Sequence, residues 1–288
     1  MHGTKAILIL WASVALGSDF SGTSALNFTQ TAVAFGPRPP GSAAIEKLRG
    51  YILDQLKPCG CQVTQDTFTA QTPRGPVVMK NIIARFPGRS GRGVAFTGHY
   101  DTKIFSFQFV GANDAGSSTG LLLELARVLA GKPRQDDVYL VWFDGEEAFA
   151  EWGPADGLYG SRHLAGVWAA DGTAKKLKAL INLDMLGDRD LRISWEANSY
   201  QPLEKLVWQV ATDLKYGSHF LGEEISIDDD HMPFVKIGAP ALDLIDWNYG
   251  PDHSWWHTEK DTMDKLSAQS FQIVGDVLLE TLRRVEGQ

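Results

Sequence analysis

The strongest constraint on the fold is the alternation of strand-like and helix-like segments along most of the chain. Apolar runs typical of strands lie at residues 77–86, 94–97, 138–143, 179–183 and 241–245. Helices are expected at residues 117–129, 202–214, 233–237 and 267–284, and a further helix begins after Ser42 and ends by Gly60. This alternation predicts an α/β fold, a three-layer sandwich whose mixed, mostly parallel central sheet carries helices on both faces. No linker or internal repeat interrupts it, so residues 18–288 are expected to form a single domain.

The first residues differ in character from the rest of the chain. Lys5 precedes an apolar run at residues 6–17, after which Ser and Gly become frequent. This pattern is typical of a secretory signal peptide and predicts cleavage after Gly17, with the mature protein secreted or periplasmic. The run is too short to span a bilayer comfortably, and an uncleaved anchor is the alternative interpretation.

The net charge of the chain bears on its partners, and its two cysteines bear on disulfide formation. The formal charge of −8 argues against nucleic acid or an anionic membrane as a partner. We expect a monomer that has no stable membrane association once the leader is removed. Cys59 and Cys61 are the two cysteines of the chain, and their spacing leaves open whether they are free or loosely paired.

Acidic and imidazole side chains follow several of the predicted strands. His99 and Asp101 come after the strand at 94–97, Glu146 and Glu147 after 138–143, and Asp184 ends the strand at 179–183. In a parallel sheet, binding sites form in the crevice beyond the carboxyl ends of the strands. We therefore expect these side chains to meet at one edge of the sheet.

Two more side chains complete a candidate zinc site at that edge. Asp114 lies in a Gly-rich loop just before a predicted helix, and His257 lies in the loop after the strand at 241–245. A catalytic zinc needs about three protein ligands and one open position. Asp114, His257 and one glutamate of the 146–147 pair supply the ligands. The other glutamate is left to carry a proton, and Asp101 is a candidate partner for the imidazole of His99.

Several motifs resemble those of the glutaminyl-peptide cyclotransferases (glutaminyl cyclases), which belong to the zinc aminopeptidase-like superfamily. The resemblance runs from about Phe35 to the C-terminus. Its motifs are His99-Tyr-Asp-Thr-Lys103, Phe109-Val-Gly-Ala-Asn-Asp114, Phe143-Asp-Gly-Glu-Glu-Ala-Phe149, Leu183-Asp-Met-Leu-Gly187, Asp229-Asp-His-Met-Pro-Phe234 and Trp256-His-Thr258.

The resemblance implies a role for each matching residue. Asp114, Glu147 and His257 would hold one zinc ion, and Glu146 would be the general acid/base. Asp184 and Asp229 would surround the reacting amide. The pocket for the substrate would be formed by Trp152, Ile227 and Trp256, with Tyr249 as the candidate aromatic that closes over it.

The implied reaction is zinc-dependent cyclisation of the N-terminal glutamine of peptides or proteins to pyroglutamate, with release of ammonia. The loop at residues 246–255 is longer than expected for the animal enzymes. Tyr249 therefore does not align clearly with the aromatic residue that closes over the substrate in that family.

Two other functions remain open on sequence grounds. A two-zinc aminopeptidase would use His99 and Asp184 for a second ion and Glu146 to activate a bridging hydroxide. A non-catalytic peptide-binding domain would have lost a ligand or the base, and no such loss is visible. The acidic run at residues 228–230 is also compatible with a solvated turn that caps the helix at Pro233.

Overall fold

Six strands form one sheet in the computed structural model, which describes residues 19–287. The predicted signal peptide at residues 1–17 lies outside the described residues. Across the sheet the strands follow the order β1 (Gln62–Thr72), β2 (Gly75–Phe86), β4 (Asp137–Phe143), β3 (Gly93–His99), β5 (Leu177–Asp184) and β8 (Ala241–Ile245). The pairs β4–β3, β3–β5 and β5–β8 are parallel, whereas β1–β2 and β2–β4 are antiparallel. The predicted mixed, mostly parallel sheet is confirmed.

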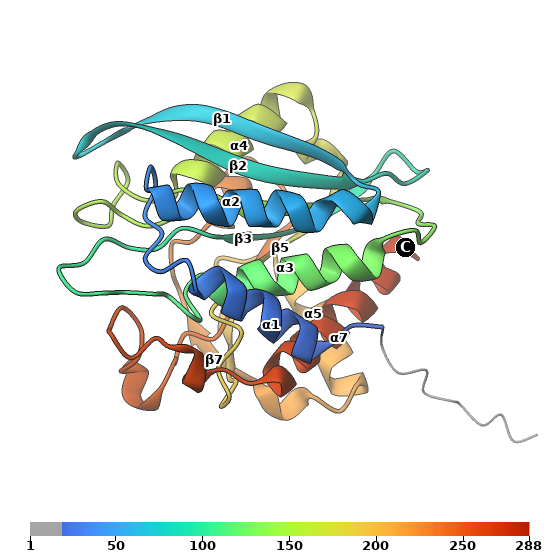
Figure 1. Cartoon of the computed structure of the whole chain (residues 1–288). Helices are drawn as coiled ribbons and strands as arrows, with labels where there is room; N and C mark the ends of the chain where they lie inside the picture. The colour runs from blue at the N-terminus through green and yellow to red at the C-terminus, as the bar shows by residue number, and fades with distance from the viewer. Residues whose placement is uncertain (1–18, 288) are drawn as a thin grey trace, which may run out of the picture.

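Helices cover both faces of this sheet, and strand residues alternate between them (Figure 1). Phe96 and Leu140 face a large core, and their neighbours Ala95 and Val141 face a smaller one. The large core is closed by α1 (Gly22–Val33), α2 (Ala43–Leu56), α3 (Gly116–Leu129), α5 (Gln201–Asp213) and α7 (Ala268–Glu286). The smaller core is closed by α4 (Tyr159–Asp171) and α6 (Met232–Lys236). The central strands are therefore buried on both sides, which explains their continuous apolar sequences.

A second, two-stranded parallel sheet lies beside β8 and is formed by β6 (Ile193–Glu196) and β7 (Phe220–Ile225). The chain after β7 runs through residues 226–231 into α6. Short 3-10 turns occur at Lys57–Cys59, Ala174–Lys176, Gly217–His219, Pro251–His253 and Met263–Lys265. The long connections gather near the carboxyl ends of the parallel strands, where the sequence places the candidate ligands.

Most predicted elements lie within a few residues of their expected bounds. Ser42 accepts the N–H of Ile45 and begins α2, as expected, and β8 covers the predicted residues. The sequence did not indicate α1, β1, α4 or the β6–β7 pair. The strand β1 escapes recognition because it is an edge strand with mostly exposed, polar residues, so its apolar pattern is weak. Cys59 and Cys61 are both free thiols.

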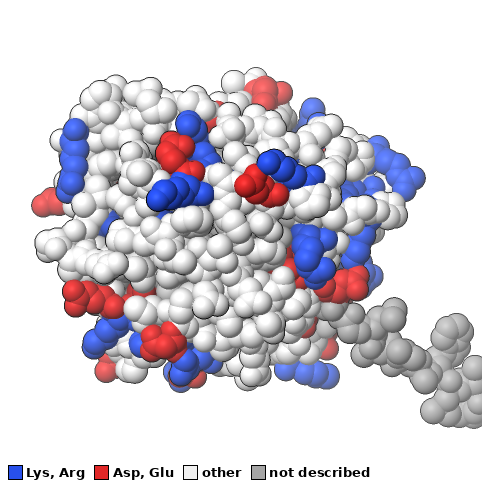
Figure 2. Space-filling view, viewed as in Figure 1, with Lys and Arg blue, Asp and Glu red and all other residues white. Residues whose placement is uncertain are grey.

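Acidic and basic side chains are interspersed on the face seen in Figure 2, without a broad patch of a single sign. From residue 19 to residue 287, no helix has both the length and the apolar character needed to cross a bilayer.

Candidate metal centre and active site

A cavity of about 490 Å³ opens at the carboxyl ends of β3, β4, β5 and β8. It is lined by the residues that the strand-end argument singled out, together with apolar side chains from the surrounding loops. The lining residues are His99, Lys103, Asp114, Glu146, Glu147, Ala150, Trp152, Asp184, Ile227, Asp228, Asp229, Ile245, Trp247, Trp256 and His257. Acidic groups and indole rings both line the cavity, so it offers polar and apolar surfaces to a ligand.

Three predicted zinc ligands converge in this cavity. Nε2 of His257 lies 3.0 Å from Oε1 of Glu147 and 3.2 Å from Oδ2 of Asp114. One ligand atom from each of the three residues lies within 4.8 Å of the others, close enough to share one ion. Both carboxylates are buried, and the imidazole is half-buried.

The local chain path explains how Asp114 and Glu147 are presented. Gly111 has a φ of +51°, and a Cβ on it would lie 1.9 Å from the carbonyl oxygen of Asp114. Only glycine fits this tight turn, which places Asp114 just before α3. Gly145, with a φ of +72°, turns the chain sharply after β4, so the adjacent Glu146 and Glu147 follow a turn rather than a regular strand.

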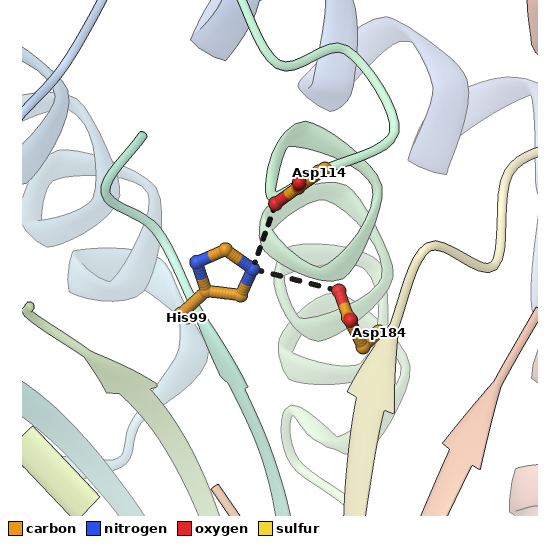
Figure 3. Close-up of side chains that lie close together, drawn as sticks. All are labelled: His99, Asp114 and Asp184. Atoms are coloured by element: carbon orange, nitrogen blue, oxygen red, sulfur yellow. Dashed lines mark ion pairs between the residues drawn. The ribbon is translucent and has the colours of Figure 1, made fainter. Parts of the chain in front are cut away.

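A second group of possible ligands shares Asp114 with the first (Figure 3). The ring of His99, at the end of β3, points between Asp114 and Asp184. Nε2 of His99 lies 3.2 Å from Oδ1 of Asp114 and 3.5 Å from Oδ1 of Asp184. The structure therefore brings together the three residues that a second ion would use.

The donor set and its electrostatics fit a divalent cation. Burial by itself would lower the pKa of His257, but Glu147 and Asp114 outweigh burial and raise that pKa to about 9. Burial would raise the pKa of Asp114, yet hydrogen bonds to His257 and His99 hold it well below its usual range. Excess negative charge thus surrounds the two imidazoles. Carboxylate oxygens mixed with imidazole nitrogen are ligands that zinc accepts.

Glu146 is not part of either ligand group, although it is the neighbour of Glu147. Its side chain lines the cavity and is almost completely buried. Oε2 of Glu146 lies 3.7 Å from Nδ1 of His99. Burial, followed by the nearby charges of Glu147 and Asp229, raises the pKa of Glu146 well above its usual value, although His99 opposes the shift. A carboxyl group in this setting can hold a proton near neutral pH.

Asp101 fixes the backbone of Glu146 and Glu147 through hydrogen bonds. It is fully buried, and its carboxylate accepts the backbone N–H groups of Glu146 at 3.0 Å and Glu147 at 3.3 Å. Its Oδ1 lies 3.6 Å from Nδ1 of His99, which is too long for the hydrogen bond that a partner of this imidazole would make. Nζ of Lys103 donates to Oε2 of Glu147 at 3.3 Å. Asp101 and Lys103, two residues of one short segment, therefore support the glutamate pair.

Further acidic groups lie in the cavity wall and behind it. Burial, followed by the charge of Asp229, raises the pKa of Asp184 to about 7, although His99 opposes the shift. Asp229 lines the cavity and is 5% exposed, so the acidic run at 228–230 is not simply a solvated turn. Asp230 and Asp243 are fully buried beside it, and burial raises the pKa of both well above the usual range. The sequence did not indicate Asp243, because it lies inside an apolar strand.

The apolar walls agree with the expected pocket in three of four positions. Trp152, Ile227 and Trp256 line the cavity, and Trp256 stacks on the ring of His257 with centroids 3.9 Å apart. Trp247, which the sequence left unassigned, also lines it.

Tyr249 is not among the lining residues. It is completely buried, and its hydroxyl donates to Oδ1 of Asp261 at 2.7 Å. Its position in a loop without periodic pattern gave no sign of this inward orientation.

Comparisons with known proteins place this site in a family. The model of peptidase family M28 matches residues 81–282. The chain is 32% identical to the glutaminyl-peptide cyclotransferase of Drosophila melanogaster over 78% of this chain and 70% of that protein. It is 33% identical to a glutaminyl-peptide cyclotransferase-like protein of Bos taurus, over 80% of this chain and 66% of the bovine protein. The chain thus spans about two thirds of the length of these relatives.

Solved structures are similar to this chain over nearly all of its length. A glutaminyl cyclase from an Acidobacteriales bacterium is 39% identical and superposes with a TM-score of 0.91, covering 99% of both chains. A Zn-dependent exopeptidase from Parabacteroides distasonis is 26% identical and has a TM-score of 0.84, covering 94% of this chain and all of that one.

Proposed function

Because the chain belongs to the glutaminyl-peptide cyclotransferases of peptidase family M28, we propose that it cyclises the N-terminal glutamine of peptides to pyroglutamate. The observation that carries this proposal is the convergence of Asp114, Glu147 and His257, with Glu146 beside them and outside the ligand group. In the reaction, the α-amine attacks the γ-amide carbon of the same residue, a five-membered lactam forms, and ammonia leaves.

The three convergent side chains would hold one zinc ion. Zinc bound there would polarise the γ-carbonyl oxygen and stabilise the negative charge that develops on it. The contribution of the chain is to hold two carboxylates and one imidazole at the floor of the cavity in fixed positions. Asp101 and Lys103 support this arrangement through their contacts with Glu147.

Glu146 is the proposed proton carrier. It would accept a proton from the attacking α-amine and return it to the leaving nitrogen, so that the nitrogen departs as ammonia. Its position in the cavity wall allows this exchange, and its backbone is fixed by Asp101. Asp184 and Asp229, in the same cavity, would accept hydrogen bonds from the substrate amine and amide and orient them for attack.

The apolar walls would restrict the conformation of the substrate's glutamine side chain. A glutamine side chain has several rotatable bonds, and cyclisation requires one folded arrangement of them. Indole rings of Trp152 and Trp256 would confine the side chain to that arrangement and lower the entropic part of the barrier. The same rings would limit access of water, which competes with the amine as a nucleophile.

A second candidate is a two-metal aminopeptidase, and the meeting of His99, Asp114 and Asp184 favours it. We propose one ion rather than two, because the chain is 39% identical to the Acidobacteriales glutaminyl cyclase and 26% identical to the Zn-dependent exopeptidase. Metal stoichiometry and product identity separate the two functions. Two tightly bound zinc ions together with release of N-terminal residues would reject the cyclase proposal.

The decisive experiment follows ammonia release from a glutaminyl dipeptide with and without a chelator. We expect one zinc per chain, release of one ammonia per pyroglutamyl product, and loss of turnover after zinc removal. Asp114→Ala should lose both zinc and activity, whereas Asp54→Ala, at an exposed position on α2, should retain both. Ammonia release by Asp114→Ala protein that holds no zinc would contradict the proposed site.

A further inference from the structure

A single buried carboxylate connects the segment that carries Asp114 to the segment that carries His257. Asp261 is 1% exposed and follows His257 in the last long loop before α7. Its Oδ1 accepts the backbone N–H of Asn113 at 2.8 Å, and its Oδ2 accepts the backbone N–H of Asp114 at 3.2 Å. The carboxylate therefore holds the backbone of a metal ligand directly.

Tyr249 binds the same carboxylate from the other side. Its hydroxyl donates to Oδ1 of Asp261 at 2.7 Å, and its ring packs edge-on against Trp255 with centroids 5.6 Å apart. Tyr249 precedes His257 in the chain and Asp261 follows it. The hydrogen bond between them thus closes a loop that contains His257, and the same carboxylate ties that loop to Asp114.

Asn113 connects the turn that carries Asp114 to the chain that follows β5. Its side-chain amide donates to the carbonyl of Met185 at 2.9 Å, and its Oδ1 accepts the N–H of Gly187 at 2.7 Å. The turn that presents Asp114 is therefore held on one side by the chain after β5 and on the other by Asp261.

We propose that Asp261 and Tyr249 are positioning residues that hold Asp114 opposite His257 and Glu147 before a metal ion arrives. The proposal rests on the metal site of the proposed function and not on the cyclisation reaction. Ligands held in place lose less freedom when they bind an ion, so the pair should increase zinc affinity. Partners of metal ligands commonly contribute about 10- to 100-fold in affinity.

A matched tyrosine–aspartate pair elsewhere in the molecule separates this role from simple support of the fold. The hydroxyl of Tyr216, after α5, donates to Oδ2 of Asp276 in α7 at 2.9 Å. This pair has the same chemistry, lines no part of the cavity and contacts none of the three ligands. Removing its hydrogen bond should affect stability alone.

The experiment measures zinc affinity by competition with a chelator, in parallel with the Tm of the metal-free protein. We expect Tyr249→Phe to weaken zinc binding several-fold, because Phe keeps the ring packing but leaves Asp261 with one donor fewer. Asp261→Asn should weaken zinc binding about 10- to 100-fold, because an amide offers one acceptor atom where the carboxylate offers two. Tyr216→Phe and Asp276→Asn should lower the Tm and leave zinc affinity unchanged.

The outcomes distinguish this inference from the proposed function. Wild-type zinc affinity in both Tyr249→Phe and Asp261→Asn would overturn the positioning role while leaving the metal site intact. If Asp261→Asn fails to fold, Tyr249→Phe still decides the question, because its ring is retained. A wild-type protein that binds no zinc would instead reject the metal site itself, and the positioning role with it.

Discussion

Nε2 of His257 lies 3.0 Å from Oε1 of Glu147, although 110 residues separate the two along the chain. Both side chains leave loops that follow strands of the same sheet, β8 and β4, and both reach the floor of one cavity. Asp114 lies within reach of the same imidazole at 3.2 Å. Three loops of different lengths therefore deliver three ligand atoms to one point, which is the arrangement that a single ion requires.

The two adjacent glutamates should respond differently to the same substitution. Glu146→Gln should retain zinc and lose turnover by about 10²- to 10⁴-fold, because an amide cannot shuttle the proton. Glu147→Gln should lose zinc affinity, because its Oε1 belongs to the ligand group. Zinc content and the rate of ammonia release, measured on both variants, check this prediction. Equal zinc loss in the two variants would contradict the division of roles.

The two tryptophans of the pocket should also differ in their effects. Trp152 is 44% exposed, so Trp152→Ala should raise KM about tenfold, a loss of about 1.4 kcal/mol, with little change in Tm or zinc content. Trp256→Ala should raise KM and also weaken zinc binding, because the indole stacks on His257. Trp152→Phe should recover part of the lost affinity. A KM for Trp152→Ala equal to that of the wild type would remove Trp152 from the pocket wall.

Glu196 lies outside the cavity lining and fixes the position of residues 226–231, which supply part of the cavity wall. It ends β6 and is completely buried. Its Oε1 accepts the N–H of Ile227 at 3.3 Å, and its Oε2 lies 3.0 Å from Nε2 of His231. Burial would raise the pKa of Glu196, but the hydrogen bond to His231 and further donors outweigh it and lower that pKa. The ionised carboxylate thus fixes the chain on both sides of Asp229.

Glu196→Gln should therefore raise KM about tenfold without changing zinc affinity, because Ile227 and Asp229 would lose their fixed positions in the wall. Glu204→Gln is the matched control: Glu204 accepts the backbone N–H of Glu196 at 2.8 Å and does not line the cavity. Its KM should match that of the wild type. A KM for Glu196→Gln equal to that of the wild type would show that Glu196 supports the fold only.

The raised pKa of Glu204 predicts that the stability of the folded protein depends on pH. It is completely buried, and burial, followed by the charge of Glu196, raises its pKa to about 7, although the N–H of Glu196 and the amide of Gln201 oppose the shift. An unfolded glutamate has a pKa of about 4.3. Between these two values the folded state binds more protons than the unfolded state, so this group lowers stability as the pH rises from about 4.3 towards 7.

Glu204→Gln removes this titration. The Tm of the variant relative to the wild type should increase by a few degrees between pH 5 and pH 8, because only the wild type must bury a charge at the higher pH. Thermal unfolding of both proteins at the two pH values checks the sign. A difference in Tm that stays constant with pH would place the pKa of Glu204 near its unfolded value.

Much of the fold was predictable because it depends on local pattern. The apolar runs of β3, β4, β5 and β8 marked strands buried on both faces, and Ser42 marked a helix start. The strand β1 was not predictable, because it lies at the sheet edge and exposes most of its side chains. Recognition from sequence therefore depended on how much apolar surface an element buries.

Within the site, the sequence determined which side chains could act, and the tertiary structure determined what each of them contacts. Asp114, Glu146, Glu147, Asp184 and His257 could be placed near one another because the carboxyl ends of parallel strands share one edge of a sheet. The inward turn of Tyr249 onto Asp261 and the burial of Asp243 could not be inferred. The contact between Tyr249 and Asp261 depends on the path of a loop that has no periodic pattern. The burial of Asp243 depends on which elements pack around β8. Neither is determined by a local pattern in the sequence.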